Sequence, residues 1–373
     1  MANRGRTLDS EVFCIKDLKE QASKKLPKMY REYFNEGAMD MITLRDNEAA
    51  FDRYRLRPRI LKNVSYVDTS TTIWGSKVLF PFGFSPAAMH RLAHPDGEVG
   101  TSKACAALNV AMGLSAYATD SLEDVIAQGS GKTNPYAMQI SIMKDRSLTR
   151  QLLQRAEKAG YKALLLTVDA PMLGRRLNEY RNSFGMPEEM KYPNIAPGMD
   201  ASNLEEGDNA LAYENGVDWD EAISYIKSIT NLPIWVKGLY TAEDVATAIS
   251  YGLDGVVISN HGGRQLDSVP ATLDALRECA PVAKGKISIA IDGGVRRGTD
   301  IFKAIALGAD FCFAGRIPIW GLAYNGSKGV ELAINLLYDE FKLAMGLAGC
   351  KSVSEINRGH LSILEANGIL SKL

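Results

Sequence analysis

The stretch GVVISNHGGRQLD, residues 255–267, joins a buried strand to a group of reactive side chains. Its first four residues are apolar, rich in β-branched types and too few for a helix, so they predict a buried strand. His261, two glycines and Arg264 follow within a few residues. An imidazole and a guanidinium so close together add little to the stability of a fold. They suit a site that holds an anion and removes a proton from it.

Short apolar runs of this kind recur along the chain, and each is followed by an amphipathic segment. The runs are VLFPFGFS from Val78, VAMGLS from Val110, PYAMQIS from Pro135, ALLLTVD from Ala163, PIWVKG from Pro233, GVVIS from Gly255, ISIAIDGG from Ile287 and FCFAGR from Phe311. Apolar strands that alternate with helices predict a parallel sheet buried on both faces. Eight such units are the number that closes a (β/α)8 TIM barrel.

The ends of the runs favour this α/β barrel over an open, doubly wound sheet. Nearly every run ends in a polar group, and the carboxyl ends of barrel strands form one catalytic face. The first strand–helix junction also lacks the GxGxxG turn of a nucleotide-binding open sheet. The strand-end residues are Ser115, Gln139, Ser141, Thr167, Asp169, Lys237, Ser259, Asn260, His261, Asp292 and Arg316.

The 373 residues are predicted to form a single domain with additions to the barrel. Residues 1–70 are expected to be mostly helical and to close the bottom or the side of the barrel, which residues 71–350 form. Residues 177–218 are rich in Pro, Gly and acidic residues and have no periodicity, which predicts a long lid loop after the fourth strand. Residues 351–373 are expected to be a C-terminal tail.

Composition argues against several classes of function. A formal net charge of −1 does not favour nucleic acid or an anionic membrane as a partner. No apolar run approaches the roughly 20 residues of a membrane span, and the N-terminus lacks the apolar core of a secretory signal. The five cysteines have no CxxC spacing and predict buried reduced thiols. The four histidines lack metal-ligand spacing, so no metal is expected.

The last three residues form a targeting signal. Ser371-Lys372-Leu373 is the tripeptide of a peroxisomal import signal. For a eukaryotic source it predicts a peroxisomal location and the import receptor as a partner.

Two segments near the end of the strand–helix alternation predict a phosphate site. Asp292 and two glycines precede Arg296 and a helix start, and Gly315 with Arg316 follows the next strand. Barrels often hold a phosphate after strands seven and eight. Arginine binds phosphate bidentately, and Asp292 suits ribityl or ribose hydroxyls. In the alternative interpretation the glycines only form tight turns and the arginines are solvated.

Three further positions predict acid–base chemistry on an anion. An unpaired buried ammonium is costly, so Lys237 is expected to pair with Asp292 or to hold negative charge on a cofactor ring such as a reduced flavin. His261 is the candidate general base, and Asp169 is placed to orient its imidazole. Arg264 and Arg176 are the candidate carboxylate donors.

Taken together, these motifs resemble the FMN-dependent 2-hydroxy acid oxidases and dehydrogenases, the glycolate oxidase group. The resemblance covers nearly the whole chain, in KLPKMYREYFNEGAMD, RYRLRPRIL, MHRLAHPDGE, TVDAPMLGRR, LPIWVKGLYTAEDV, SNHGGRQLD and IDGGVRRGTDIFKAIALGA. It implies FMN as the cofactor and oxidation of an (S)-2-hydroxy acid to the 2-keto acid. It also implies a homo-oligomer, a tetramer or an octamer.

The resemblance further implies roles for single residues. His261 takes the hydroxyl proton while hydride leaves for the flavin, and Asp169 is its partner. The substrate would be bound by Tyr33, Ser141, Arg176 and Arg264. The cofactor would be bound by Pro86, Ala87, Ala88, Ser115, Gln139, Thr167, Lys237, Ser259, Asp292, Gly294, Arg296, Gly315 and Arg316.

Two positions depart from the family pattern. Ser141 stands where a tyrosine is usual, and Tyr117 stands where the short-chain oxidases tend to have tryptophan. Both positions line the substrate side, so a substrate bulkier than glycolate is expected.

Three functions follow from these observations. The first is an oxidase that reduces O2 to H2O2, which the peroxisomal signal fits. The second is a dehydrogenase that uses a quinone or cytochrome, although no haem domain precedes the barrel and no membrane segment is present. The third is an FMN-binding protein weakened by the loss of the tyrosine at Ser141, against which the retained His261, Asp169, Arg264 and Arg176 argue.

Overall fold

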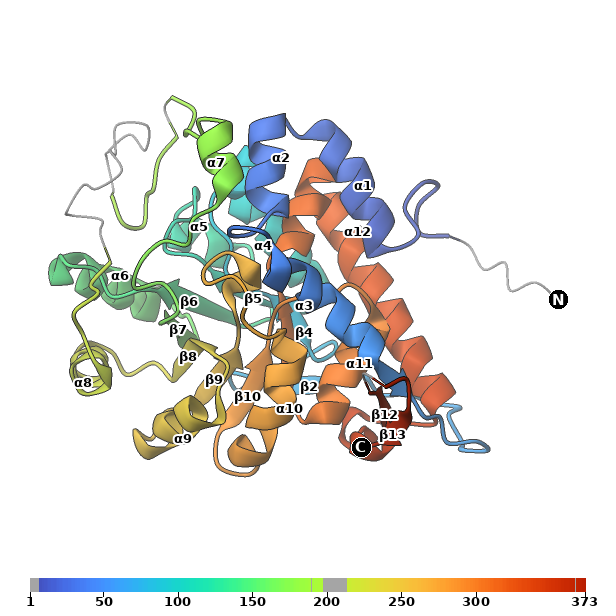
Figure 1. The fold of residues 1–373 in the computed structure, drawn as a ribbon. Coiled ribbons are helices and arrows are strands. Elements are labelled where there is room, and N and C mark those ends of the chain that lie inside the picture. Colours follow the sequence, from blue (N-terminus) through green and yellow to red (C-terminus); the bar gives the residue numbers. More distant parts are fainter. Residues whose placement is uncertain (1–6, 189, 197–212, 366) are drawn as a thin grey trace.

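A closed barrel of parallel strands forms the centre of the molecule, with helices around its outside (Figure 1). The computed structural model describes residues 7–188, 190–196, 213–365 and 367–373. The strands follow one another around the barrel as β4 (Phe82–Phe84), β5 (Ala111–Leu114), β6 (Tyr136–Ile140), β7 (Ala163–Thr167), β8 (Ile234–Leu239), β9 (Gly255–Ile258), β10 (Ser288–Ile291) and β11 (Phe311–Ala314), and β11 pairs with β4. The predicted TIM barrel is confirmed.

The helices that connect the strands cover the outer face of the barrel. They are α4 (Gly97–Leu108), α5 (Leu122–Ala127), α6 (Arg146–Ala159), α8 (Trp219–Ile229), α9 (Ala242–Ser250), α10 (Thr272–Ala283), α11 (Gly298–Leu307) and α12 (Arg316–Ala348). Alternate residues of a strand face the two sides, so Leu165 of β7 faces the barrel interior while Leu164 and Leu166 face the helices. Burial on both sides explains why the strands are almost continuously apolar.

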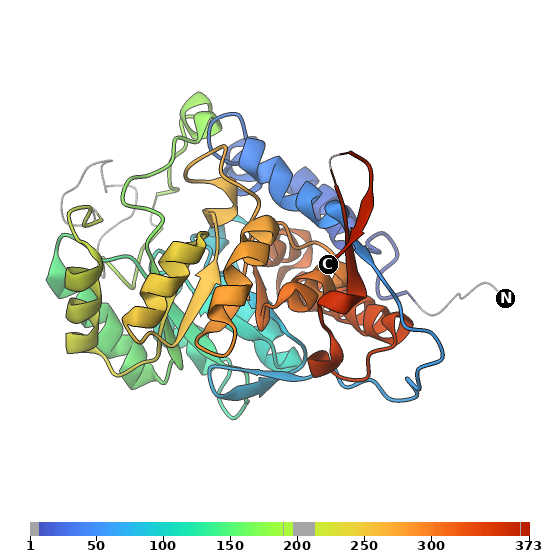
Figure 2. The ribbon, with the colours of Figure 1, turned by 60° about the horizontal axis from the view of Figure 1, so that its bottom comes forward.

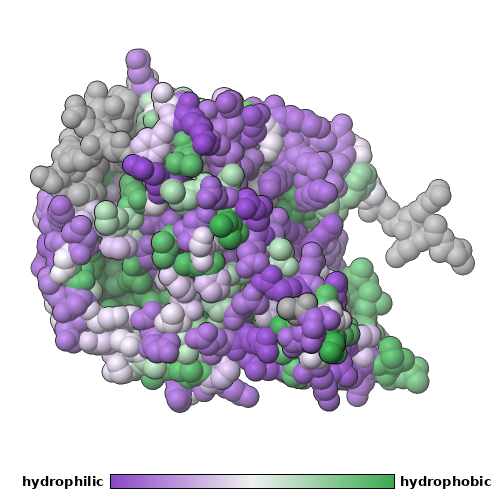
Figure 3. Space-filling view, in the orientation of Figure 1, coloured by the Kyte–Doolittle hydropathy of each residue, from purple (hydrophilic) through white to green (hydrophobic). Residues whose placement is uncertain are grey.

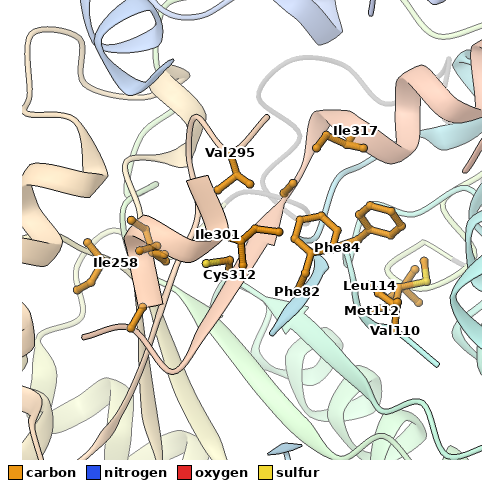
Figure 4. Packing of buried hydrophobic residues seen from close by; sticks show 14 of the residues in the cluster. Phe82, Phe84, Val110, Met112, Leu114, Ile258, Val295, Ile301, Cys312 and Ile317 are labelled. Atoms are coloured by element: carbon orange, nitrogen blue, oxygen red, sulfur yellow. The ribbon is translucent and has the colours of Figure 1, made fainter. Parts of the chain in front are cut away.

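The layer between strands and helices forms the larger part of the core. Figure 4 shows part of it, where Phe84 of β4 and Cys312 of β11 lie near Ile301 of α11 and Ile317 of α12. The five cysteines are all buried and free. No helix in the described part of the chain is long and apolar enough to cross a membrane.

A hairpin closes the bottom of the barrel. Its strands are β2 (Thr71–Ile73) and β3 (Ser76–Val78), and Trp74 at its tip stacks on Phe313 with 5.6 Å between ring centroids. The hairpin lies at the end of the barrel opposite α2 (Lys28–Asn35) (Figure 1). Of the two places expected for residues 1–70, the bottom or the side, the bottom is therefore taken by residues 71–78. The apolar run from Val78 accordingly enters the barrel only at β4.

The N-terminal helices are present as predicted, but two of them lie near the catalytic face. Helix α1 (Ile15–Lys25) packs along α12 on the side of the barrel. Helix α2 packs against the short α7 (Leu177–Arg181), and α3 (Ile42–Arg53) packs against the 3₁₀ turn η3 (His261–Gly263). The N-terminal segment therefore builds part of the site.

Residues 351–373 are not a free tail. They contain the 3₁₀ turns η4 (Val353–Glu355) and η5 (Arg358–His360) and the strands β12 (Leu361–Leu364) and β13 (Leu370–Lys372). These strands form an antiparallel sheet with β1 (Tyr54–Leu56), in which β12 is central. Figure 2 shows the hairpin of β12 and β13 beside the N-terminal helices.

The predicted lid loop, residues 177–218, falls partly outside the described residues, at 189 and 197–212. Its described parts begin with α7 and end at the N-cap of α8, where the Asp218 side chain accepts from Glu221 N–H. Phe184 stacks on Tyr33 of α2 with 4.4 Å between ring centroids. The start of this segment therefore lies against the N-terminal helices, over the carboxyl ends of the strands.

Candidate active site

A histidine–aspartate pair stands at the carboxyl ends of β7 and β9. His261 Nδ1 lies 2.9 Å from Asp169 Oδ1. Because the carboxylate engages Nδ1, Nε2 remains the ring nitrogen that can accept a proton. His261 has φ of 56°, a left-handed conformation that is uncommon for a residue with a side chain and that tends to occur at functional sites.

The two glycines after His261 allow close approach of other backbone. Gly262 and Gly263 also have positive φ. A Cβ on Gly263 would lie 2.7 Å from the backbone nitrogen of Leu44 in α3, and one on Gly262 would lie 2.8 Å from Arg316 Nη1. The glycines therefore let the histidine turn pack directly against α3 and Arg316.

Asp169 is placed to stabilise a protonated imidazole. Its side chain is only 7% exposed, and its Oδ2 has no hydrogen-bond partner among the residues that the structure describes. Burial acts to raise the pKa of Asp169, but the charges of His261 and Lys237 outweigh it and lower that pKa below its usual value. The carboxylate therefore stays ionised at neutral pH. Gln265 fixes the loop that carries Asp169, because its Nε2 donates to the backbone carbonyls of Asp169 and Met172.

Two arginines meet beside Tyr33. The side chains of Arg176 and Arg264 are 14% and 16% exposed, and both approach Glu179 Oε1, at 3.0 Å and 3.7 Å. The Arg264 guanidinium lies over the Tyr33 ring at 4.7 Å and donates to Tyr33 O. Burial, with the charge of Arg176, lowers the pKa of Arg264. Two adjacent guanidinium groups with one shared carboxylate leave net positive charge for a bound carboxylate.

A second group of polar side chains fills the carboxyl end of the barrel. Lys237 Nζ lies 3.4 Å from Asp292 Oδ2 and donates to Ser259 Oγ, so the first of the two alternatives for Lys237, pairing with Asp292, is present. Burial acts to lower the pKa of Lys237, but Asp292 and Asp169 together raise it, which keeps the ammonium charged. Ser85 Oγ also donates to Asp292 Oδ2, at 2.8 Å.

The predicted ring-binding residues lie beside this group. Gln139 Nε2 donates to Thr167 Oγ1 at 3.1 Å, and Gln139 Oε1 accepts from Ala116 N–H. Ser115 Oγ accepts from Tyr117 N–H. Residues 86–88 follow β4 and are held near this loop, because Met89 N–H donates to Tyr117 O.

The residues at the phosphate end show a different pattern of partners. Arg316 donates to the carbonyls of Phe34, Gly262 and Glu36, so it also ties α2 to the histidine turn. Burial, together with the charges of Arg264 and Arg296, lowers the pKa of Arg316 to about 9. Gly294 has φ of 85°, and a Cβ on it would lie 1.9 Å from Asn47 O. Close packing against α3 therefore requires glycine at this position.

The polar groups at the phosphate end of the site fit FMN. Within the described part of the chain, Asp292 Oδ1 is buried without a partner, which leaves it free to accept from a ribityl hydroxyl. In the same part of the chain, Arg296 Nε is likewise buried without a partner, although Nη2 of the same side chain binds Glu48. Among the described residues, a Cβ on Gly315 would meet Ser85 Cβ alone within 4 Å, at 3.8 Å, so the chain leaves room beside the Gly315 backbone. Unsatisfied acceptors and donors beside an open backbone suit a sugar phosphate.

A cavity of about 560 Å³ adjoins Asp169 of the catalytic pair. Ser141, Thr167 and Asp169 line it at the barrel end, Tyr213 lines it from the end of the lid segment, and Trp219 lines it from the start of α8. Much of the remaining wall is apolar, including Val217 and two residues of the layer between strands and helices, Leu166 and Leu239. Figure 3 shows apolar surface in a hollow on the left of the molecule, in the region of α6 and α8 in Figure 1.

The structure thus brings the predicted residues together in three connected groups and adds four that sequence reasoning missed. Those four are Ser85, Glu179, Tyr213 and Gln265. Three had a signal: Ser85 ends the first apolar run, Glu179 follows Arg176 by three residues, and Gln265 adjoins Arg264. Asn260, one of the predicted strand-end residues, is buried and exchanges two hydrogen bonds with Asn47 of α3. Tyr213 belongs to a segment without periodicity and carried no signal.

Comparison with known proteins agrees with this geometry. Residues 22–363 match the FMN-dependent dehydrogenase family. The chain is 59% identical over 365 residues to oxidase FUB9 of Fusarium oxysporum f. sp. lycopersici, covering 97% of this chain and 94% of that protein. It is 43% identical over 359 residues to human 2-hydroxyacid oxidase 1, covering 93% and 95%. A crystal structure of mandelate oxidase with 3,3-difluoro-2-hydroxy-3-phenylpropionic acid superposes with a TM-score of 0.85 at 33% identity, covering 94% and 99%.

Proposed function

Because this chain belongs to the FMN-dependent 2-hydroxy acid oxidase family, we propose that it oxidises an (S)-2-hydroxy acid to the 2-keto acid and passes the two electrons to O2, giving H2O2. The observation that carries the proposal is the His261–Asp169 pair beside the Arg176–Arg264 pair. One pair removes a proton, and the other holds a carboxylate. A 2-hydroxy acid presents both groups on adjacent carbon atoms.

Each side chain of the site has a separate role in this reaction. Arg176 and Arg264 bind the substrate carboxylate and fix the position of its α-carbon. His261 Nε2 accepts the hydroxyl proton, and Asp169 stabilises the resulting imidazolium. FMN, when bound, supplies the acceptor for the hydride that leaves the α-carbon. Lys237 keeps a positive charge at the barrel end of the site, where negative charge develops.

A side chain larger than that of glycolate is supported by the cavity beside Ser141. Ser141 is buried and opens onto the cavity of about 560 Å³ together with Asp169. Its apolar walls favour an aliphatic or aromatic side chain. The mandelate oxidase structures show that this fold accommodates ligands with a phenyl ring in a relative.

Oxygen as the electron acceptor is supported by the relatives, which are named as oxidases. The test is to measure flavin reduction and H2O2 with a panel of aliphatic and aromatic (S)-2-hydroxy acids, with and without an artificial electron acceptor. We expect stoichiometric H2O2 in air. Turnover only with the artificial acceptor would instead support the quinone- or cytochrome-linked dehydrogenase, and no flavin reduction would support the FMN-binding protein.

A peroxisomal location is supported by Ser371-Lys372-Leu373 at the end of the chain. Ser371 and Lys372 pair with Ile363 and Ser362 of β12. Recognition by an import receptor therefore requires that β13 leave the edge of its sheet, which is held by one short strand pairing.

A further inference from the structure

Tyr213 is fixed against the end of β6, next to Ser141. Its backbone forms an isolated antiparallel bridge with Met143, and Glu214 N–H donates to Ile142 O at 2.8 Å. Ser141 lies directly before Ile142 in the chain. The end of the lid segment is thus attached to the strand whose side chain at 141 is unusually small.

The side chain of Tyr213 belongs to a cluster of three tyrosines. Its ring packs edge-on against Tyr117, with 5.9 Å between centroids, and Tyr192 packs edge-on against Tyr117 at 5.5 Å. The Tyr192 hydroxyl already has a hydrogen-bond partner, because it donates to Met89 Sδ. Of these tyrosines, Tyr213 is the one that lines the same cavity as Ser141 and Asp169.

The Tyr213 hydroxyl lies near residues that we assign to the substrate. Loss of solvent raises the pKa of Tyr213 to about 12, while the Tyr117 hydroxyl and the charge of Arg176 act in the opposite direction. Tyr33 and Asp169 also act to raise this pKa, so the phenol lies among the residues assigned to the substrate and its general base. At neutral pH the phenol keeps its proton and can donate a hydrogen bond.

We propose that Tyr213 is a substrate-binding residue of this enzyme, whose hydroxyl donates to an oxygen of the bound acid and whose ring forms one wall of the pocket for the acid's side chain. This proposal rests on the proposed function. The Ser141 side chain is several ångströms shorter than a tyrosine, so it leaves both the donor position and the wall to another residue. Tyr213 is held within the same cavity and supplies both.

The test compares Tyr213→Phe with the matched control Tyr192→Phe. Both changes remove one hydroxyl from the same cluster and keep its ring packing. We expect Tyr213→Phe to lower kcat/KM for the best acid of the panel by about 10- to 100-fold, as expected for a lost hydrogen bond to a charged or developing-charge group. FMN content and Tm should stay unchanged. Tyr192→Phe should stay within about twofold of wild type.

A second readout does not depend on turnover. Binding of phenylpyruvate, a bulky 2-keto acid, is measured by calorimetry for wild type and both variants. We expect a weaker Kd for Tyr213→Phe alone. Adding Ser141→Tyr to Tyr213→Phe should recover part of the lost affinity for small 2-keto acids such as pyruvate, because the new phenol enters the same cavity.

The outcomes separate this proposal from the proposed function. Equal Kd values for Tyr213→Phe and Tyr192→Phe overturn the role of Tyr213, whatever the turnover. Wild type that binds phenylpyruvate but oxidises no member of the panel overturns the proposed function, while the Kd comparison still decides on Tyr213. Wild type that binds neither pyruvate nor phenylpyruvate overturns both.

Discussion

Glu179 Oε1 lies 3.0 Å from Arg176 Nη1, although Arg176 is one of the two arginines assigned to the substrate's carboxylate. Among the described residues, the same oxygen is buried without a well-aligned hydrogen bond. Glu179 therefore offsets the charge of the arginine pair without itself satisfying a donor, and the guanidinium N–H groups that do not bond backbone carbonyls remain for an incoming carboxylate.

The first prediction concerns this shared carboxylate. Glu179→Gln removes a negative charge next to the substrate's own, and repulsion between such charges is appreciable in a partly buried site. We expect the Kd for a 2-keto acid to fall by roughly tenfold at low salt, with a smaller effect at high salt. Calorimetry at two ionic strengths measures it. A weaker Kd would mean that Glu179 acts chiefly by holding Arg176 and Arg264 in position.

The second prediction separates proton removal from substrate binding. His261→Gln should keep FMN and bind the acid but slow flavin reduction by roughly 10²–10⁴-fold, because the proton acceptor is lost. Arg264→Lys should also weaken binding, since the planar guanidinium is lost. Stopped-flow flavin bleaching at varied substrate concentration gives both quantities. Near-normal flavin reduction in His261→Gln would show that another group is the base.

The third prediction concerns the cofactor. A Cβ on Gly315 meets little in the chain itself, so Gly315→Val should leave the Tm of the FMN-free protein nearly unchanged. If the Gly315 backbone borders the phosphate, the same change should weaken FMN binding by at least about tenfold. Gly346→Val is the control, because a Cβ there meets no described residue within 4 Å and Gly346 lies on α12, away from the strand ends. Flavin fluorescence titration measures the affinity, and equal values for the two variants would contradict the assignment.

The fourth prediction concerns the C-terminus. Deleting residues 371–373 removes most of β13 but leaves the pairing of β1 with β12 intact. Activity should therefore be unchanged, while a fluorescent fusion should move from peroxisomes to the cytosol. Fluorescence microscopy of full-length and shortened fusions checks it. Continued punctate fluorescence would mean that another segment directs the sorting.

The barrel and the centre of the site were predictable because both follow from local patterns. Strands buried on two faces are apolar throughout, so a polar group such as Gln139 or Lys237 at a strand end stands out. The hairpin of residues 71–78 and the strand β12 were missed, because they are short and take their stability from packing on Phe313 and from pairing with β1. Glu179 and Tyr213 reach the site through tertiary contacts of the lid segment, where no periodicity marks a side chain's direction.

The last prediction concerns Ser141 and the size of the substrate. Ser141→Tyr places a phenol in the cavity that Ser141 shares with Asp169 and Tyr213. The added ring should fill the space that we assign to the substrate's side chain and supply a donor near the reacting oxygen. We therefore expect wild type to prefer a bulky aliphatic or aromatic acid over glycolate in kcat/KM, and Ser141→Tyr to reverse this order. Ser141→Ala is the control, because it removes only a hydroxyl and keeps the space, so the preference for bulky acids should remain. If wild type prefers glycolate and Ser141→Tyr changes little, the residue at 141 does not set substrate size and the cavity serves another purpose.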